Sequence, residues 1–316
     1  MGRLPYRHAV TVPTPTHPKI EIDVTADLAR ALLADQHADL ASLPLHGRTF
    51  GWDNLTWRLG DDLALRFPVR AMSSTLVERE QRWLPVLAPR LPVPVPAPVR
   101  DGRPALGYPW AWSVVPWLAG DQVAATPVAD RTAWAGELAA ALAALHSPAP
   151  RDAPVNPYRG VPLADRYDVM VGRQTPDVPQ VDALRAALDA GRAAPAWDRD
   201  PVWVHGDPHP GNLVSHHGHL TGLIDFGDLC AGDPASDLAA AWLTFDAAGR
   251  EVFAARTQAA RGWDDATWVR ARAWAASYVP VLLAHPEEYP LMAAVGRHTA
   301  AQVAADVDRR SAPRRR

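Results

Sequence analysis

The chain has 316 residues, of which 48% are hydrophobic and 21% are charged, a composition typical of a globular protein with one large or two smaller domains. A formal net charge of -3 gives no basic surface for a nucleic-acid backbone, and the single cysteine, Cys230, excludes an internal disulfide and a cysteine-based zinc cluster. No segment reaches the ~18 apolar residues of a membrane span, and the first residues lack the apolar core of a secretory signal. We therefore expect a cytoplasmic protein that acts on a small molecule, without a nucleic-acid or membrane partner.

The first third of the chain is predicted to be rich in β-structure. Residues 1–20 hold four prolines and no periodic pattern, so we expect an extended arm there, followed by a helix that Thr25 caps. Two segments of alternating apolar and polar residues, 54–59 and 63–67, flank a Gly-Asp-Asp turn. That arrangement predicts a β-hairpin.

A helix and two extended segments are predicted next. Ser73 or Ser74 is placed to cap a helix that runs to about residue 88. The following segment, 91–99, contains too many prolines for a central strand and is expected to form an extended edge. Residues 110–118 have the apolar character of a buried strand that leads into a short connector.

Beyond the connector the pattern becomes mainly helical. Apolar residues in segment 134–145 recur at helical spacing, and helical patterns return from residue 233 onward. Between them, residues 147–200 show only short helical patterns and no candidate site, and residues 202–228 form a compact β-segment. A β-rich N-terminal part and a helical C-terminal part predict an α+β protein with two lobes, whose cleft would hold a ligand.

The segment that carries chemistry is HGDPHPGNLV, residues 205–214, followed by LIDFGD, residues 223–228. Asp207 and Asn212 are separated by four residues, and Asp225 follows after two short apolar strands. Phosphoryl transfer needs a carboxylate that orients the acceptor hydroxyl and accepts its proton, together with oxygen ligands for magnesium. Each half alone would be an ordinary turn, but the two in this order predict a kinase in which Asp207 is catalytic and Asn212 and Asp225 hold Mg²⁺.

These motifs resemble the catalytic segment of the aminoglycoside phosphotransferases, which are relatives of macrolide kinases, choline kinases and protein kinases. The resemblance extends to GDPASDLA, where Asp233-Pro234 and Asp237 match the family's segment beyond the metal aspartate. It implies that Asp237 braces the catalytic loop and that His205 maintains the loop's shape, although Asp237 could instead cap a helix. It also implies a bilobal protein-kinase-like fold with a β-rich N-lobe and a mainly helical C-lobe. The expected parts are an extended arm at 1–20, a nucleotide-binding N-lobe at 21–118, a catalytic and substrate-binding C-lobe at 119–310, and a basic tail at 311–316.

The resemblance places the nucleotide, ATP or GTP, in the N-lobe. There the family has a strand lysine held by a glutamate from the next helix, and Arg66 and Glu80 occupy these positions. Arginine stays charged and forms paired hydrogen bonds with phosphate and carboxylate, although a surface Arg66 without a ligand is the alternative. Backbone groups of the connector, around Val115 and Trp117, are expected to contact the base, and residues 47–54 are a candidate loop over the phosphates. If Arg66 is not the phosphate donor, the nearest candidates are Arg48, Arg58 and Arg70.

The acceptor is expected to be a hydroxyl group of a small molecule, and the resemblance makes an aminoglycoside the first candidate. A polycation would need carboxylates near Asp207, and the C-terminal part offers Asp228, Asp246, Asp264, Asp265, Glu287 and Glu288. A macrolide would instead need an apolar pocket, for which the candidates are Trp242, Trp263, Trp268 and Trp274, with packing in the helical core as the alternative. A metabolic amino-alcohol or sugar kinase shares the same motif, and a catalytically silent nucleotide-binding protein is favoured only by the arginine at position 66.

Overall fold

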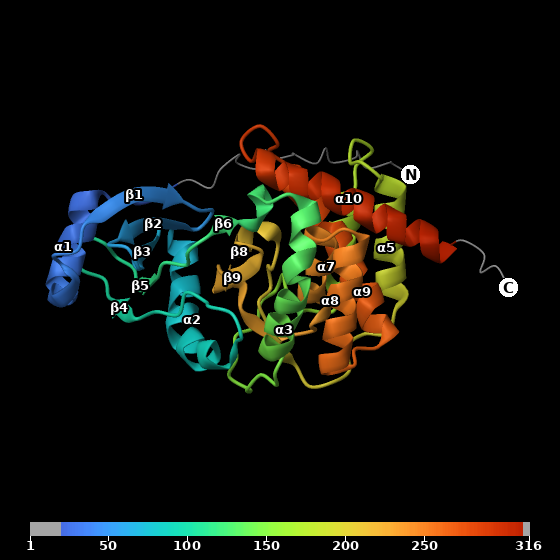
Figure 1. The fold of residues 1–316 in the computed structure, drawn as a ribbon, viewed down its shortest axis with the longest axis horizontal. Coiled ribbons are helices and arrows are strands. Elements are labelled where there is room, and N and C mark those ends of the chain that lie inside the picture. The colour runs from blue at the N-terminus through green and yellow to red at the C-terminus, as the bar shows by residue number, and fades with distance from the viewer. Residues whose placement is uncertain (1–19, 312–316) are drawn as a thin grey trace, which may run out of the picture.

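The structure, a computed structural model, describes residues 20–311 and forms an α+β protein with the two lobes predicted from the sequence (Figure 1). A sheet dominates the lobe built from the N-terminal part of the chain, and helices dominate the other lobe. Apart from Ile20 and Ser311, the predicted arm and basic tail lie outside the described residues. Between residues 20 and 311, no helix is both long and apolar enough to cross a bilayer.

An antiparallel five-stranded sheet forms the framework of the N-lobe, with the strand order β1-β2-β3-β5-β4. The predicted hairpin is confirmed, because β2 and β3 pair from Leu59 opposite Leu63 to Asn54 opposite Pro68. Side chains alternate across a strand, so Phe67 enters the apolar core of this lobe and Arg66 points to the other face. The strands are β1 (Leu45–Phe50), β2 (Asn54–Leu59), β3 (Leu63–Pro68), β4 (Arg100–Gly102) and β5 (Trp112–Pro116).

Helix α1 (Ala26–Gln36) begins where the sequence predicted. The hydroxyl oxygen of Thr25 accepts a hydrogen bond from the N–H of Leu28 at 3.3 Å, which satisfies one of the free donors of the first turn. Leu32 and Leu33, one turn further on, are buried in the N-lobe core. The helix therefore covers the sheet with its apolar face.

Helix α2 (Ala71–Leu87) begins earlier than predicted. Ser73 and Ser74 lie inside its first turn, so the prediction that one of them caps the helix is wrong. The acceptor comes instead from Glu21, whose Oε2 accepts a hydrogen bond from the N–H of Ala71 at 3.1 Å. A tertiary contact thus replaces the local cap.

The edge of the sheet lies beyond the proline-rich segment. No strand forms within 91–99, and the short strand β4 is the edge partner of β5. Gly102 permits this pairing, because a Cβ at that position would lie 2.0 Å from the Trp112 ring. The predicted extended edge is therefore displaced a few residues along the chain.

Helices form most of the C-lobe and surround two small antiparallel sheets, β6-β8-β9 and β10-β7. The helix predicted over 134–145 is confirmed as α3, and its buried Leu138 and Leu142 share one large apolar core with Phe226 and Trp274. Helix α10 runs across α5, α7 and α9 (Figure 1). The helices are α3 (Ala135–Leu145), α4 (Leu163–Gly172), α5 (Val181–Ala193), α6 (Ala235–Leu238), α7 (Ala240–Thr244), α8 (Ala247–Arg261), α9 (Asp265–Leu282) and α10 (Pro290–Ser311). The strands are β6 (Asp121–Gln122), β7 (Val202–Val204), β8 (Leu213–His216), β9 (His219–Leu223) and β10 (Cys230–Gly232).

Helix α10 carries a histidine whose protonation is linked to folding. The Nε2–H of His298 donates to the carbonyl of Phe245 at 3.1 Å, and burial lowers the pKa of His298 from 6.5 to about 4. Between these two pH values the unfolded chain binds a proton that the folded chain does not, so the contribution to stability is complete above pH 6.5 and is lost as the pH falls toward 4. We expect protonation of His298 to lower the free energy of unfolding by ~2 kcal/mol between pH 7 and pH 4.5. His298→Gln should remove that part of the pH dependence in urea unfolding, and parallel pH profiles of the two proteins would contradict the assignment.

Candidate active site

A fully buried carboxylate holds the loop that follows β7. Asp237 in α6 has no solvent exposure, and its oxygens accept hydrogen bonds from the backbone N–H groups of His205 at 2.7 Å and Gly206 at 2.8 Å. His146 supplies a third partner, with Nε2 at 3.0 Å from Asp237 Oδ2. A buried carboxylate needs such donors to offset its loss of hydration. The contacts of Asp237 are therefore those of a brace for the loop and not those of a helix cap.

The first residues of the loop are tied to the neighbouring chain segments. The Nε2–H of His205 donates to the carbonyl of Ile224 at 2.9 Å, and its Nδ1 accepts from the N–H of Asp207 at 3.1 Å, which makes the ring the neutral tautomer. Gly206 has a φ of 89°, and a Cβ there would lie 2.7 Å from the carbonyl oxygen of Asp228. Only glycine allows both the backbone angle and the close approach.

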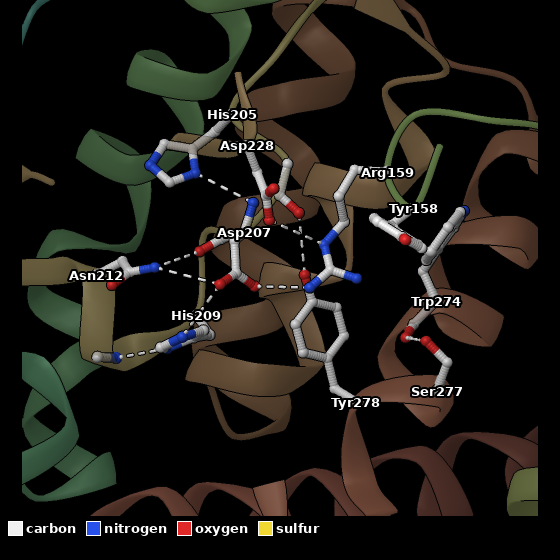
Figure 2. Close-up of polar contacts among 12 residues, drawn as sticks. Tyr158, Arg159, His205, Asp207, His209, Asn212, Asp228, Trp274, Ser277 and Tyr278 are labelled. Atoms are coloured by element: carbon white, nitrogen blue, oxygen red, sulfur yellow. Dashed lines mark hydrogen bonds and ion pairs between the residues drawn. The ribbon is translucent and has the colours of Figure 1, made fainter. Parts of the chain in front are cut away.

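The carboxylate of Asp207 lies at the centre of a group of polar side chains (Figure 2). Arg159 Nη2 lies 3.5 Å from Oδ1, and His209 Nε2 and Asn212 Nδ2 each lie 3.5 Å from Oδ2. Burial by itself raises the pKa of Asp207, but His209 and Arg159 outweigh it and hold the pKa well below the ordinary 3.8. Asp207 is thus ionised at neutral pH, and because it is partly exposed it can accept a hydrogen bond from a ligand hydroxyl.

A second polar group joins β3, α2 and the turn after β9. Arg66 Nη1 lies 2.6 Å from both carboxylate oxygens of Glu80, and Nη2 lies 2.9 Å from Asp225 Oδ1. Burial by itself lowers the pKa of Arg66, but Glu80 and Asp225 outweigh it and raise the pKa, so the guanidinium stays charged. Arg66 and Glu80 are buried, and nearly half of the Asp225 side chain is exposed. Arg66 is therefore not an isolated surface residue, and the pairing with Glu80 predicted from the sequence is present.

The other nucleotide-side candidates are placed differently. Val115 is buried in β5, and the N–H of Trp117 donates to the carbonyl of Asp62 at 2.8 Å. That donor is therefore occupied within the N-lobe. Residues 47–54 form the end of β1, the turn and the start of β2. The three alternative arginines bind elsewhere in the N-lobe: Arg48 to Asp23, Arg58 to the carbonyl of Asp61, and Arg70 to Asp53.

Asn212 and Asp225 offer oxygen atoms that fit a magnesium ion. The amide nitrogen of Asn212 donates to the carbonyl of Asp207 at 2.9 Å, which leaves its Oδ1 for a cation. The N–H of Ile224 donates to the carbonyl of Asn212 at 2.9 Å and so ties the residue before Asp225 to the loop. Within the described chain, no cluster of three or more His, Cys, Asp or Glu residues could hold a metal ion. Magnesium would therefore need phosphate and water ligands as well, which is its usual preference in nucleotide sites.

Comparison with known proteins identifies the family. A sequence model of the phosphotransferase enzyme family matches residues 45–274, which include both polar groups. The chain belongs to this family. A comparison with curated proteins gives no match.

Solved structures of phosphotransferases share the fold. The GDP complex of aminoglycoside 2'-phosphotransferase-IIIa superposes with a TM-score of 0.62 at 20% identity, covering 88% of this chain and 98% of that chain. Macrolide 2'-phosphotransferase type I has a TM-score of 0.58 at 25% identity and covers 87% and 98% of the two chains. Macrolide 2'-phosphotransferase MphH from Brachybacterium faecium has a TM-score of 0.58 at 22% identity and covers 92% and 99%. The protein is thus a phosphotransferase with the kinase-like fold of these enzymes.

Three side chains at this phosphotransferase site were not indicated by the sequence. Asn156 Nδ2 donates to Asp228 Oδ1 at 2.8 Å. Arg159 Nε lies 3.6 Å from Asp228 Oδ2, and the Tyr278 hydroxyl donates to the carbonyl of Gly206 at 3.1 Å (Figure 2). Two of them come from the segment between α3 and β7, for which no site was predicted, and one comes from α9. The proline and glycine around Asn156 and Arg159 signal only a turn.

Removing the brace tests the role of Asp237. Asp237→Ala leaves buried donors without an acceptor, so we expect the free energy of unfolding to fall by about 3 kcal/mol and phosphoryl transfer to fall more than roughly tenfold. Asp264, which caps α9, is the matched control, and Asp264→Ala should cost ~1 kcal/mol with turnover unchanged. Urea unfolding and steady-state rates measure both effects. Equal losses in the two variants would show that Asp237 acts only as a cap.

Proposed function

We propose that this protein is a magnesium-dependent kinase that transfers the terminal phosphoryl group of ATP or GTP to a hydroxyl group of a small molecule. The proposal rests on one observation: the ionised, partly exposed Asp207 lies in the same site as the oxygen atoms of Asn212 and Asp225, which can coordinate a metal ion. Residues 21–118 would bind the nucleotide, and residues 119–310 would carry catalysis and the acceptor. Related structures solved with GDP, ADP and ATP support nucleotide use.

Asp207 would act on the acceptor. Its carboxylate accepts the hydrogen bond of the acceptor hydroxyl and directs that oxygen toward the terminal phosphorus. As the new oxygen–phosphorus bond forms, the bond to the bridging oxygen breaks, the nucleoside diphosphate keeps the electron pair, and the hydroxyl proton passes to Asp207. The low pKa of Asp207 keeps the carboxylate ionised, so it can accept this hydrogen bond.

The buried ion pair would act on the nucleotide. Magnesium, when bound, supplies positive charge that neutralises the phosphates, and Asn212 and Asp225 would hold it. Arg66 would bind phosphate oxygens through its N–H donors, and Glu80 would keep the guanidinium in place. This arrangement leaves little support for a catalytically silent protein, since the arginine takes the lysine's place with its partner intact.

The family relationship points to two acceptor classes. Aminoglycoside enzymes with the same fold were solved with kanamycin, gentamicin and streptomycin, and macrolide enzymes are also similar to this chain. The tryptophans considered for a macrolide pocket belong to the helical core or pack against it: Trp242, Trp263, Trp268 and Trp274. A metabolic amino-alcohol or sugar kinase is the further alternative. A panel of aminoglycosides, macrolides, amino alcohols and sugars, each assayed with ATP and GTP, tests the proposed activity.

Replacing Asp207 should separate transfer from nucleotide binding. Asp207→Ala is expected to lower turnover on the order of a hundredfold or more, because general-base and orienting effects of this size are usual. The dissociation constant of the nucleotide should change by less than about twofold, because the carboxylate contacts neither base nor phosphates in the proposed complex. Chelation of magnesium should abolish transfer by the wild type. A variant that kept most of its turnover would exclude Asp207 as the catalytic residue.

Arg66 tests the phosphate contact. Arg66→Ala should weaken nucleotide use by on the order of tenfold or more, and Arg66→Lys should restore much of it. Glu80→Ala should have a smaller effect, and the double variant should be less than additive, as expected of partners in one contact. The exposed Arg48, paired with Asp23, is the control, and Arg48→Ala should leave the nucleotide Michaelis constant unchanged. An unaffected Michaelis constant and turnover in Arg66→Ala would assign the phosphates to another donor.

A further inference from the structure

Asp207 has beside it an arginine whose hydrogen-bond donors are largely unused. The guanidinium of Arg159 lies 5.0 Å over the ring of Tyr278, and three quarters of the Arg159 side chain is buried. Within residues 20–311 it makes one hydrogen bond, at 3.5 Å to Asp207, and a looser ion pair at 3.6 Å to Asp228. A guanidinium has five N–H donors, so most of them are left to bind oxygen atoms of a ligand.

A second arginine, Arg166, stacks on the tyrosine that precedes Arg159. The guanidinium of Arg166 in α4 lies 5.0 Å over the ring of Tyr158. Tyr158 precedes Arg159 in the chain, and Figure 2 shows Tyr158 beside Arg159. The Nε of Arg166 is buried and has no hydrogen-bond partner in the described chain. Stacking on the Tyr278 ring holds the Arg159 cation beside Asp207.

Three of the acidic candidates for receiving ammonium groups are engaged within the described chain. Asp228 is held by Asn156 and faces Arg159. Asp246 and Asp264 cap helices, and Asp264 lies about 20 Å along α9 from Tyr278 at the usual helical rise. The remaining acidic candidates are exposed at a helix start or in a turn: Asp265, Glu287 and Glu288.

We propose that Arg159 is an acceptor-binding residue that selects hydroxyl compounds with anionic or carbonyl oxygens near the reacting hydroxyl and disfavours polycationic acceptors. This rests on the proposed function, because it requires the acceptor hydroxyl to meet Asp207. A charged, partly desolvated guanidinium repels a nearby ammonium group and forms charge-assisted hydrogen bonds with oxygen. The acceptor class is therefore set by charge at the reaction centre.

Kanamycin binding tests the charge of the site without requiring phosphoryl transfer. Calorimetry with magnesium and a non-hydrolysable ATP analogue should show that Arg159→Glu binds kanamycin roughly tenfold tighter than the wild type, with Arg159→Gln between them. Arg256→Glu makes the same change in net charge on the exposed surface of α8 and should leave the affinity unchanged. Melting curves establish that each variant is folded. Equal kanamycin affinity in the wild type, Arg159→Glu and Arg159→Gln would overturn the inference.

Turnover across the acceptor panel provides a second test. The best polycationic acceptor should have a kcat/KM at least roughly tenfold below that of the best non-cationic acceptor, and the reverse order would overturn the inference. The two proposals can fail separately. Transfer that no panel compound raises above the Asp207→Ala level would count against the kinase assignment, while the binding experiment would still report the charge of the site.

Discussion

The buried carboxylate of Asp237 is the interaction on which the geometry of the site depends. An ion without hydration is costly unless donors surround it, and here the donors are the backbone N–H groups of His205 and Gly206. Satisfying the carboxylate therefore fixes the path of the loop. The His205 ring also donates a hydrogen bond to the carbonyl of Ile224, which precedes Asp225. This bond holds the segment of Asp207 against the segment of the proposed metal site.

The same principle links the two lobes. The Arg66 side chain extends from β3 and its guanidinium is buried. The carboxylates of Glu80 and Asp225 balance its positive charge. Glu80 is buried and Asp225 is partly exposed, so the first pair is closed to solvent and the second is open to it. In the proposed complex, Arg66 would bind the nucleotide phosphates and its partner Asp225 would help to hold the metal, so the two binding events would be coupled.

The groups around Asp207 set its acidity and, in the proposed complex, would set its choice of acceptor. His209 and Arg159 stabilise the ionised carboxylate, which can accept a hydrogen bond from a hydroxyl. Arg159 also places positive charge beside the proposed catalytic carboxylate. The acceptor must therefore be inferred from the charges at this site, because specificity depends on the site and not on the fold.

The sequence by itself determined the features whose causes lie within a few residues. The Thr25 cap, the hairpin and the spacing that marks Asp207 follow from local chemistry, and together they predict the two lobes and the core of the site. Only the tertiary structure decided which distant segments complete them. Glu21 caps α2 from 50 residues away, and Arg159 reaches the catalytic loop across 48 residues, while Tyr278 reaches it from α9. No local periodicity encodes these contacts, because they arise when helices and loops pack against one another and bring unrelated stretches of chain to the same carboxylate.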